Sequence, residues 1–295
     1  MSATAAVFAY HDVGARCLRV LLDAGVAVRL VVTHRDDPAE AVFFESVAEA
    51  ARARGLDVDT PDDPNAPSFV ARLRSLAPDF LFSFYYRRML SPDVLATARR
   101  GAYNMHGSLL PRYRGRAPVN WAILKGERET GATLHEMVAK PDAGRIVDQQ
   151  AVPIGENDLA IDVMRRVTDA AEVVLRRSLP RILDGSARPA AQDLAGGSYF
   201  GARRPEDGRV DWRRPAREIH DLVRAVAPPY PGAFAELEGR RVRILQTWWG
   251  DPPPGLPAEG APGDVARQDG LAFVRCGDGR WLEMRRVEIM GESAP

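Results

Sequence analysis

The first half of the chain alternates short apolar runs with segments of helical periodicity. Runs rich in β-branched and aromatic residues predict strands, and apolar residues spaced three and four apart predict helices. The predicted strands are Ala5–Tyr10, Val26–Thr33, Phe80–Tyr85, Ala102–His106, Thr130–Met137 and Arg145–Ile154. The predicted helices are Gly14–Ala24, Ala39–Arg54, Pro92–Arg99 and Leu159–Leu183. This α/β alternation predicts a Rossmann-like, mostly parallel sheet with ligands at the carboxyl ends of its strands.

A different pattern follows a stretch rich in Gly, Ala, Ser and Arg. One helix is predicted over Pro215–Val226, and short strands are predicted around Phe234 and over Val242–Leu245, Leu271–Cys276 and Trp281–Val287. Short strands separated by turns favour a small β-barrel-like (OB-like) subdomain. We therefore expect a Rossmann-like catalytic domain over residues 1–190, a linker over 191–209 and a small C-terminal β-barrel-like subdomain over 210–295.

Composition and charge narrow the class of protein. Basic and acidic residues both total 40 among 295 residues, and this neutral balance argues against a dedicated nucleic-acid binder. Cys17 and Cys276 lie too far apart for a usual metal or disulfide spacing. The sequence shows neither a signal-peptide pattern nor an apolar run long enough to span a membrane. We expect a cytoplasmic protein with no membrane insertion and no metal.

The segment that begins at Asn104 carries the most specific candidate chemistry. Residues two apart in a strand share a face, so Asn104 and His106 should project together at the end of a strand. An imidazole that moves protons and a carboxamide that stabilises an oxyanion suit acyl transfer. Asp142, in a predicted loop between two strands, could return to the same edge and orient the imidazole. The residues alone also allow an ordinary hydrogen-bonded pair at a strand end.

The sequence lacks the motifs of several other enzyme classes. Ser108 is not in a GxSxG elbow, so a serine hydrolase is disfavoured. The five histidines form no HExxH spacing, and no GxGxxG opens the first predicted helix. A metal enzyme and a dinucleotide-binding site are therefore not supported.

The pattern Asn104-x-His106-x-Ser108-Leu109-Leu110-Pro111, with a later Asp142-x-Gly144, resembles the signature of formyltransferases that use 10-formyltetrahydrofolate. The resemblance implies a Rossmann-like N-terminal domain, a small C-terminal β-barrel subdomain and 10-formyltetrahydrofolate as formyl donor. It also implies that Asn104 stabilises the tetrahedral oxyanion, His106 shuttles the proton, and Asp142 orients His106.

Within this family, the chain most resembles the formyltransferase domains of bifunctional polymyxin-resistance enzymes. The similar segments are Val7–Gly14, Thr33–Asp36, Phe82–Arg87, His106–Asn120, Glu129–His135 and Arg224–Phe234. The acceptor implied is UDP-4-amino-4-deoxy-L-arabinose, in a pathway that modifies lipid A. Those enzymes carry a decarboxylating dehydrogenase domain after the linker, and we expect this chain to be a stand-alone version. A homo-oligomer and docking to a separate UDP-glucuronate decarboxylase both stay open.

The resemblance further implies which residues contact the folate. They are Arg88, Met89, Leu90, Arg116, Val138, Ala139, Lys140, Pro141 and Asp142. The relatives carry His at the position of Arg88, so the contact implied there is made by the backbone. A pterin needs backbone donors and acceptors in a flat apolar slot, and the glutamate tail of folate favours Arg.

Three alternatives follow from the same residues. Methionyl-tRNA formyltransferases usually carry His–Ala–Ser and Trp–Arg–Gly–Ala–Ala–Pro–Ile, where this chain has His106–Gly107–Ser108 and Tyr113–Arg114–Gly115–Arg116–Ala117–Pro118–Val119. A tRNA enzyme is also expected to carry net positive charge, which this chain lacks. Another nucleotide-amino-sugar formyltransferase is the nearer alternative. A non-catalytic module that binds folate or nucleotide sugar is the third.

Overall fold

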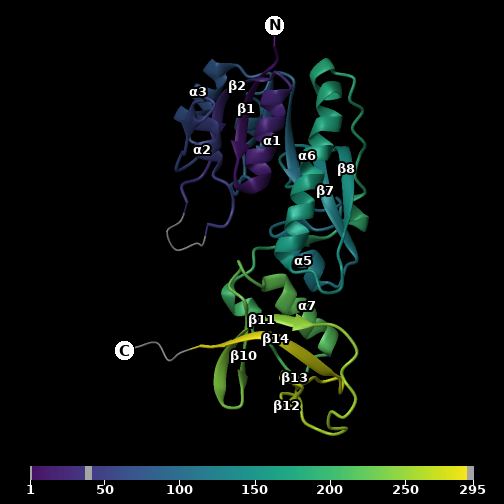
Figure 1. Ribbon diagram of the computed structural model, residues 1–295. Coiled ribbons are helices and arrows are strands. Elements are labelled where there is room, and N and C mark those ends of the chain that lie inside the picture. Colours follow the sequence, from purple (N-terminus) through teal and green to yellow (C-terminus); the bar gives the residue numbers. More distant parts are fainter. Residues whose placement is uncertain (1, 37–41, 291–295) are drawn as a thin grey trace, which may run out of the picture. The chain divides into compact units, whose positions relative to one another are not determined.

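The computed structural model describes residues 2–36 and 42–290. The chain divides into two compact units, each formed by several segments (Figure 1). The first unit comprises Met1–Gly115, Gly131–Val152 and Arg166–Phe200, and the second comprises Arg116–Thr130, Pro153–Arg165 and Gly201–Pro295.

The first unit is built on a seven-stranded sheet in the order β3-β2-β1-β4-β5-β7-β8. Its strands are β1 (Thr4–Ala9), β2 (Ala27–Val32), β3 (Val58–Asp59), β4 (Phe80–Phe84), β5 (Gly101–His106), β7 (Glu129–Glu136) and β8 (Ile146–Pro153). The strands from β3 to β5 are parallel, and β7 runs antiparallel to β5. Strands β1 and β4 are buried along almost their whole length because helices cover both faces of the sheet. The predicted fold class is confirmed.

Helices of the first unit pack on this sheet through apolar side chains. They are α1 (His11–Asp23), α2 (Val47–Arg52), α3 (Pro67–Leu76), α4 (Pro92–Leu95) and most of α6 (Ala160–Asp184). Phe69 and Leu73 of α3 and Val94 of α4 share one core cluster with residues of β1, β2 and β4. Arg16 of α1 forms ion pairs with two acids of α6, so these helices lie side by side. No helix of the described chain combines the length and apolar character needed to cross a bilayer.

The predicted helix over Ala39–Arg54 is wrong in its extent. Residues 39–41 lie outside the described part, residues 42–46 are not helical, and α2 begins only at Val47. Ser46 ends the loop because its side chain accepts the backbone N–H of Glu49 and caps the helix. Phe44 is held outside the helix, where its ring stacks on His11.

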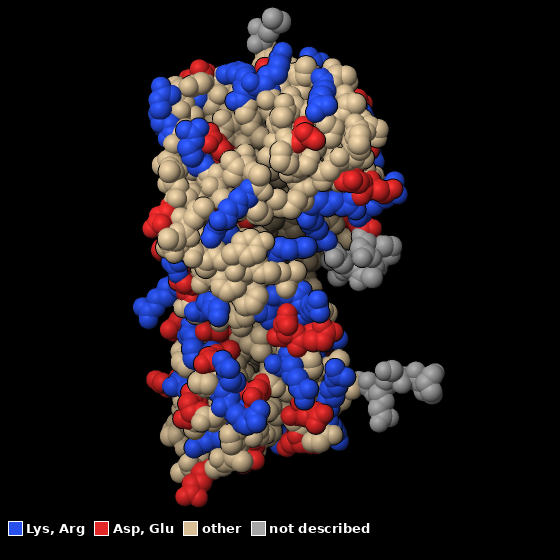
Figure 2. Space-filling model, turned by 180° about the vertical axis from the view of Figure 1, so that it is seen from behind, with Lys and Arg blue, Asp and Glu red and all other residues tan. Residues whose placement is uncertain are grey.

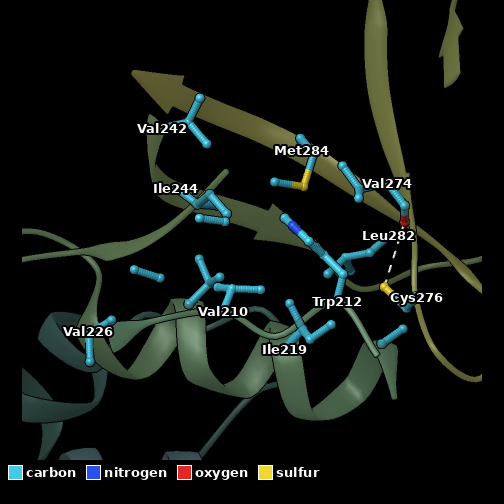
Figure 3. Close-up of a cluster of buried hydrophobic side chains, with 14 residues drawn as sticks. Val210, Trp212, Ile219, Val226, Val242, Ile244, Val274, Cys276, Leu282 and Met284 are labelled. Atoms are coloured by element: carbon cyan, nitrogen blue, oxygen red, sulfur yellow. Dashed lines mark hydrogen bonds between the residues drawn. The ribbon is translucent and has the colours of Figure 1, made fainter. Parts of the chain in front are cut away.

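The second unit contains a five-stranded antiparallel sheet in the order β10-β11-β14-β13-β12. Its elements are α5 (Pro118–Leu124), α7 (Ala216–Val226), β10 (Ala233–Leu237), β11 (Arg240–Trp248), β12 (Val265–Gln268), β13 (Leu271–Arg275) and β14 (Trp281–Ile289). Figure 3 shows the core of this unit, where Ile219 and Val226 of α7 face Ile244 and Met284 of the sheet. The predicted small β subdomain is present.

The segment expected as a linker contains short regular structure. It holds two 3₁₀ turns, Leu194–Gly196 and Pro205–Gly208, and the short strand β9 (Tyr199–Phe200). Strand β9 pairs with β6 (Arg114–Gly115), which follows the candidate catalytic segment.

Candidate active site

The structure brings Asn104, His106 and Asp142 together at the carboxyl end of β5. Asn104 and His106 lie two residues apart at the end of that strand, and His106 is 6% exposed. Asp142 lies in the loop between β7 and β8, with its side chain 14% exposed and Oδ1 3.6 Å from Nδ1 of His106. These are the three residues to which the sequence assigned catalysis.

The segment after β5 determines which nitrogen of His106 can accept a proton. Nε2 of His106 lies 2.8 Å from the carbonyl oxygen of Tyr113. A carbonyl only accepts, so Nε2 carries a hydrogen and the lone pair of the neutral ring is on Nδ1. Ser108 donates its hydroxyl to the carbonyl of Arg112 at 2.6 Å. Ser108 therefore stabilises the turn and does not act as a nucleophile.

Asp142 is held in place by its backbone and by one N–H donor. Its φ is +51°, a left-handed conformation that non-glycine residues seldom adopt. Oδ2 accepts the backbone N–H of Gly115 at 2.9 Å. A Cβ on Gly144 would lie 1.8 Å from the carbonyl oxygen of Glu136, so only glycine allows this loop to return against β7. This close approach explains the Asp-x-Gly spacing.

The surroundings of Asp142 keep its carboxylate ionised. Burial alone would raise its pKa, but His106, His135 and the N–H of Gly115 together hold the pKa of Asp142 well below its usual range. An acid with so low a pKa is a poor proton donor near neutral pH. Asp142 therefore acts as a fixed negative charge beside Nδ1 of His106.

His135 belongs to the same site, and the sequence reasoning missed its role. Strand β7 pairs His135 directly with Asn104. Nδ1 of His135 donates to the carbonyl of Glu136 at 2.7 Å, which leaves Nε2 to accept from the Asn104 amide at 3.1 Å. Nε2 is also 3.6 Å from Oδ1 of Asp142. His135 thus orients the carboxamide and leaves the second N–H of Asn104 for a ligand.

The expected folate contacts after β4 lie in a loop held by two side chains. Nε2 of His34 accepts the N–H of Arg87 at 3.0 Å. Asn65 donates to the carbonyl of Met89 at 3.0 Å and accepts the N–H of Ser91 at 2.7 Å. Within this loop Arg88 is exposed, Met89 is 55% exposed and Leu90 is buried. The loop therefore presents its backbone in a fixed conformation.

The remaining expected folate contacts are in two other segments. Val138 is 44% exposed, Ala139 and Lys140 are exposed, and Pro141 is half-buried. Gln192 donates its side-chain amide to the carbonyl of Asp142 at 3.0 Å and so supports this loop. Arg116 is exposed and belongs to the second unit. The folate contacts stay a prediction.

Within residues 2–36 and 42–290, no group of three His, Cys, Asp or Glu side chains could hold a metal ion. Acidic and basic side chains lie side by side over much of the face in Figure 2.

Comparison with known proteins identifies the family. Residues 11–179 match the family "Formyl transferase", and residues 203–294 match "Formyl transferase, C-terminal domain". These two matches together span most of the chain, and they include Asn104, His106 and Asp142.

Solved structures share the fold at low sequence identity. An N-formyltransferase from Helicobacter canadensis, in complex with folinic acid and dTDP-3-aminofucose, has a TM-score of 0.76 at 19% identity, covering 97% of this chain and 99% of that one. WlaRD, a sugar 3N-formyltransferase in the presence of dTDP and 5-N-formyl-THF, has a TM-score of 0.75 at 17% identity, covering 99% and 100%. HypX from Aquifex aeolicus, in complex with tetrahydrofolic acid, has a TM-score of 0.64 at 20% identity, covering 96% and 43%.

The family matches confirm the enzyme class expected from the Asn-x-His and Asp-x-Gly patterns. They cover both units and the segment that carries the candidate catalytic residues. The chain belongs to the formyl transferase family.

Proposed function

We propose that this enzyme transfers a formyl group from 10-formyltetrahydrofolate to the 4-amino group of UDP-4-amino-4-deoxy-L-arabinose. The observation that carries the chemistry is the placement of Asp142, 3.6 Å from both His106 and His135, with His135 in turn bonded to Asn104. The choice of sugar is supported by the similar sequence segments, above all His106–Asn120. The pathway implied is the modification of lipid A that gives polymyxin resistance.

The reaction begins when the free amine of the sugar attacks the formyl carbon of the donor. A new C–N bond forms and the formyl oxygen becomes an oxyanion. Asn104 has one amide hydrogen bonded to His135, so its other amide hydrogen is available to that oxyanion. This contact strengthens as negative charge develops, which is the condition for lowering the barrier.

Proton transfer falls to His106. The attacking nitrogen gains positive charge and must lose a proton before the intermediate collapses. Nδ1 of His106 accepts that proton because Nε2 already donates to Tyr113. The resulting imidazolium lies against the carboxylate of Asp142. Collapse then breaks the bond between the carbon and N10 of the folate, and N10 takes up the proton to give tetrahydrofolate and the formamido sugar.

A second candidate acceptor is a dTDP-linked amino sugar. Two of the structures with the same fold contain dTDP or a dTDP-sugar. These likenesses are below 20% identity, whereas the segments that favour the UDP-arabinose acceptor span the active-site loop itself. We therefore rank the dTDP sugar second.

The decisive experiment is an acceptor panel at saturating 10-formyltetrahydrofolate. It compares kcat/KM for UDP-4-amino-4-deoxy-L-arabinose, dTDP-linked 3- and 4-amino sugars and charged methionyl-tRNA. We expect the UDP sugar to have the highest value. A higher value for a dTDP sugar would move the assignment to the second candidate, and formylation of methionyl-tRNA as the best substrate would refute both. If mass spectrometry finds no formyl gain on any acceptor of the panel, both proposed acceptors are wrong.

A further inference from the structure

A group of aromatic rings lies in the first unit beside the candidate active site. We call it the aromatic cluster, and it comprises Tyr10, His11, Phe43, Phe44 and Tyr85. Tyr10 and His11 follow β1, Tyr85 follows β4, and the two phenylalanines precede α2. The rings therefore gather at the edge of the sheet where parallel strands place their ligands.

The rings of the cluster pack around His11. The His11 ring stacks on Phe44 with centroids 4.4 Å apart and meets the edge of Phe43 at 5.5 Å. The ring centroid of Tyr85 lies 6.2 Å from that of His11, with the two rings tilted by 38°. Tyr10 meets Phe44 edge-on at 5.0 Å and so closes the group. The cluster therefore presents several aromatic ring faces in fixed positions.

Core packing alone does not explain this cluster. Phe43 is 36% exposed, although large rings in a core are usually covered. Nδ1 of His11 is buried without a hydrogen bond, and its charged neighbour is the carboxylate of Asp12, with Oδ2 3.6 Å away. His11 and Tyr85 have φ of +67° and +60°, conformations that carry strain and concentrate at functional sites. Each feature is accounted for if a ligand completes the cluster.

The chemistry of the cluster selects a neutral heteroaromatic group. Burial lowers the pKa of His11 to about 4 against the opposing charge of Asp12, so the ring is uncharged near neutral pH. Aromatic rings stack well on nucleobases, and an uncharged ring beside them does not repel a neutral base. The guanidinium of Arg87 lies 4.7 Å above the ring of Tyr10 and brings positive charge suited to a phosphate.

The register of the sheet places the cluster at a useful distance from His106. Ala9 of β1 pairs with Phe84 of β4, and Phe84 pairs with Met105 of β5, the residue before His106. Strand β1 is therefore two strand widths from β5, about 10 Å. In a nucleotide sugar, a ribose and a diphosphate separate the base from the sugar. A base held near β1 can thus leave the sugar amine beside β5.

We propose that the aromatic cluster binds the pyrimidine base of the nucleotide-sugar acceptor, with the base stacked on the face of Phe44 that His11 does not cover. This inference rests on the proposed function, because it assumes a nucleotide-linked acceptor. The inference names residues that would bind the nucleotide. The catalytic residues act on the amine and the formyl group and do not contact the base.

The test uses UMP as the probe and measures binding, not turnover. Isothermal titration calorimetry compares UMP and ribose 5-phosphate on the unsubstituted chain and on Phe44→Leu and Phe44→Tyr. We expect Phe44→Leu to weaken UMP binding roughly tenfold or more, as loss of one stacking ring does. Phe44→Tyr keeps a ring and should bind UMP as the unsubstituted chain does. Affinity for folinic acid should not change in any variant.

The outcomes separate this proposal from the function on which it rests. Unchanged UMP affinity in Phe44→Leu, equal affinity for ribose 5-phosphate, or no UMP binding at millimolar concentration would each overturn the base site. Loss of folinic acid affinity in place of UMP affinity would assign the cluster to the folate. If UMP binding behaves as expected but no nucleotide amino sugar is formylated, the base site stands and the proposed function fails. Circular dichroism of each variant confirms that it is folded.

Discussion

His106 in the first unit and His220 in the second are both buried, but their surroundings differ. Nδ1 of His220 bonds to Thr247 Oγ1 and Nε2 to the carbonyl of Glu156, each at 2.8 Å. Among the residues that the structure describes, His106 has one such bond, to the carbonyl of Tyr113, and its other nitrogen faces the carboxylate of Asp142. His220 is thus bonded at both nitrogens, whereas His106 has one nitrogen placed where a proton can arrive and be stabilised.

The comparison extends to the groups around each histidine. The acid nearest the second site, Asp221, forms an ion pair with the buried Arg224 at 2.7 Å, and Arg224 also donates to the carbonyl of Gly155. These bonds tie α7 to the loop that contains Glu156 and Gly155, so the network is structural. Asp142 instead faces two histidines and accepts the backbone N–H of Gly115. Burial of a histidine is therefore a weak sign of catalysis, and the partners of its two nitrogens are the stronger sign.

The largest expected effect is on turnover after substitution at the first site. His106→Ala and Asn104→Ala should each lower kcat by roughly two to four orders of magnitude, the usual contribution of one proton-transfer or oxyanion group. Folinic acid affinity, measured by calorimetry, should change little because the expected folate contacts lie elsewhere. A folded variant with near-normal kcat would remove the role assigned to that residue.

Asp142→Asn should lower turnover by a smaller factor, roughly ten- to a hundredfold, and also change its pH dependence. Without the carboxylate, the imidazolium that forms when His106 takes the amine proton loses its charge partner and is less stable. The acidic limb of the kcat profile should then move to lower pH while the plateau falls. The measurement is kcat against pH for both proteins. An acidic limb that does not move would show that Asp142 has no charge interaction with His106.

Much of the fold could be predicted because several strands are short apolar runs. Strands β1 and β4 are buried along almost their whole length, and the second half of β2 is buried, so these runs are easily recognised. Helix α2 was predicted too long because the sequence periodicity cannot show that Phe44 packs on His11. The short helix α3 was not predicted, since its ten residues give few turns of periodicity.

The candidate site likewise contains residues that the sequence predicted and one that it did not. Asn104 and His106 are neighbours in one strand, so their common face follows from sequence spacing. His135 meets Asn104 only through the pairing of β5 with β7, and such a register is not visible in a single sequence. The only signal was its place at the end of the similar segment Glu129–His135. Residues brought together by distant segments are thus the ones that sequence spacing misses.

His135 offers a sharper test of how the first site is organised. His135→Phe removes the acceptor that orients the Asn104 amide and should lower kcat by roughly tenfold, whereas His135→Gln keeps an acceptor and should lose less. In an Asn104→Ala background, His135→Phe should cost little further, because the amide that it orients is gone. This double-mutant cycle is measured in kcat. Fully additive losses would mean that His135 acts independently of Asn104.

The smallest expected effect on turnover comes from His220, which should instead affect stability. Burial lowers the pKa of His220 to about 4, from 6.5 for an exposed histidine. Between these values the unfolded chain binds a proton that the folded chain does not, so stability is complete above pH 6.5 and falls as the pH drops toward 4. The full contribution is about 3 kcal/mol. His11 and His34 titrate in the same range and also affect stability. The measured quantity is therefore the change in unfolding free energy with pH, compared between the unsubstituted chain and His220→Gln.

Tryptophan fluorescence can follow this difference in the second unit alone. The five tryptophans, Trp121, Trp212, Trp248, Trp249 and Trp281, all belong to that unit. Urea unfolding monitored by their emission at pH 7.5 and pH 4.5 should show a smaller loss of stability on acidification in His220→Gln than in the unsubstituted chain. At pH 7.5 kcat should stay within about twofold of normal, because His220 has no proton-transfer role and its two hydrogen bonds are made within the second unit. An equal pH dependence in the two proteins would show that His220 does not stay neutral in the folded state, and a large fall in kcat would end the contrast with His106.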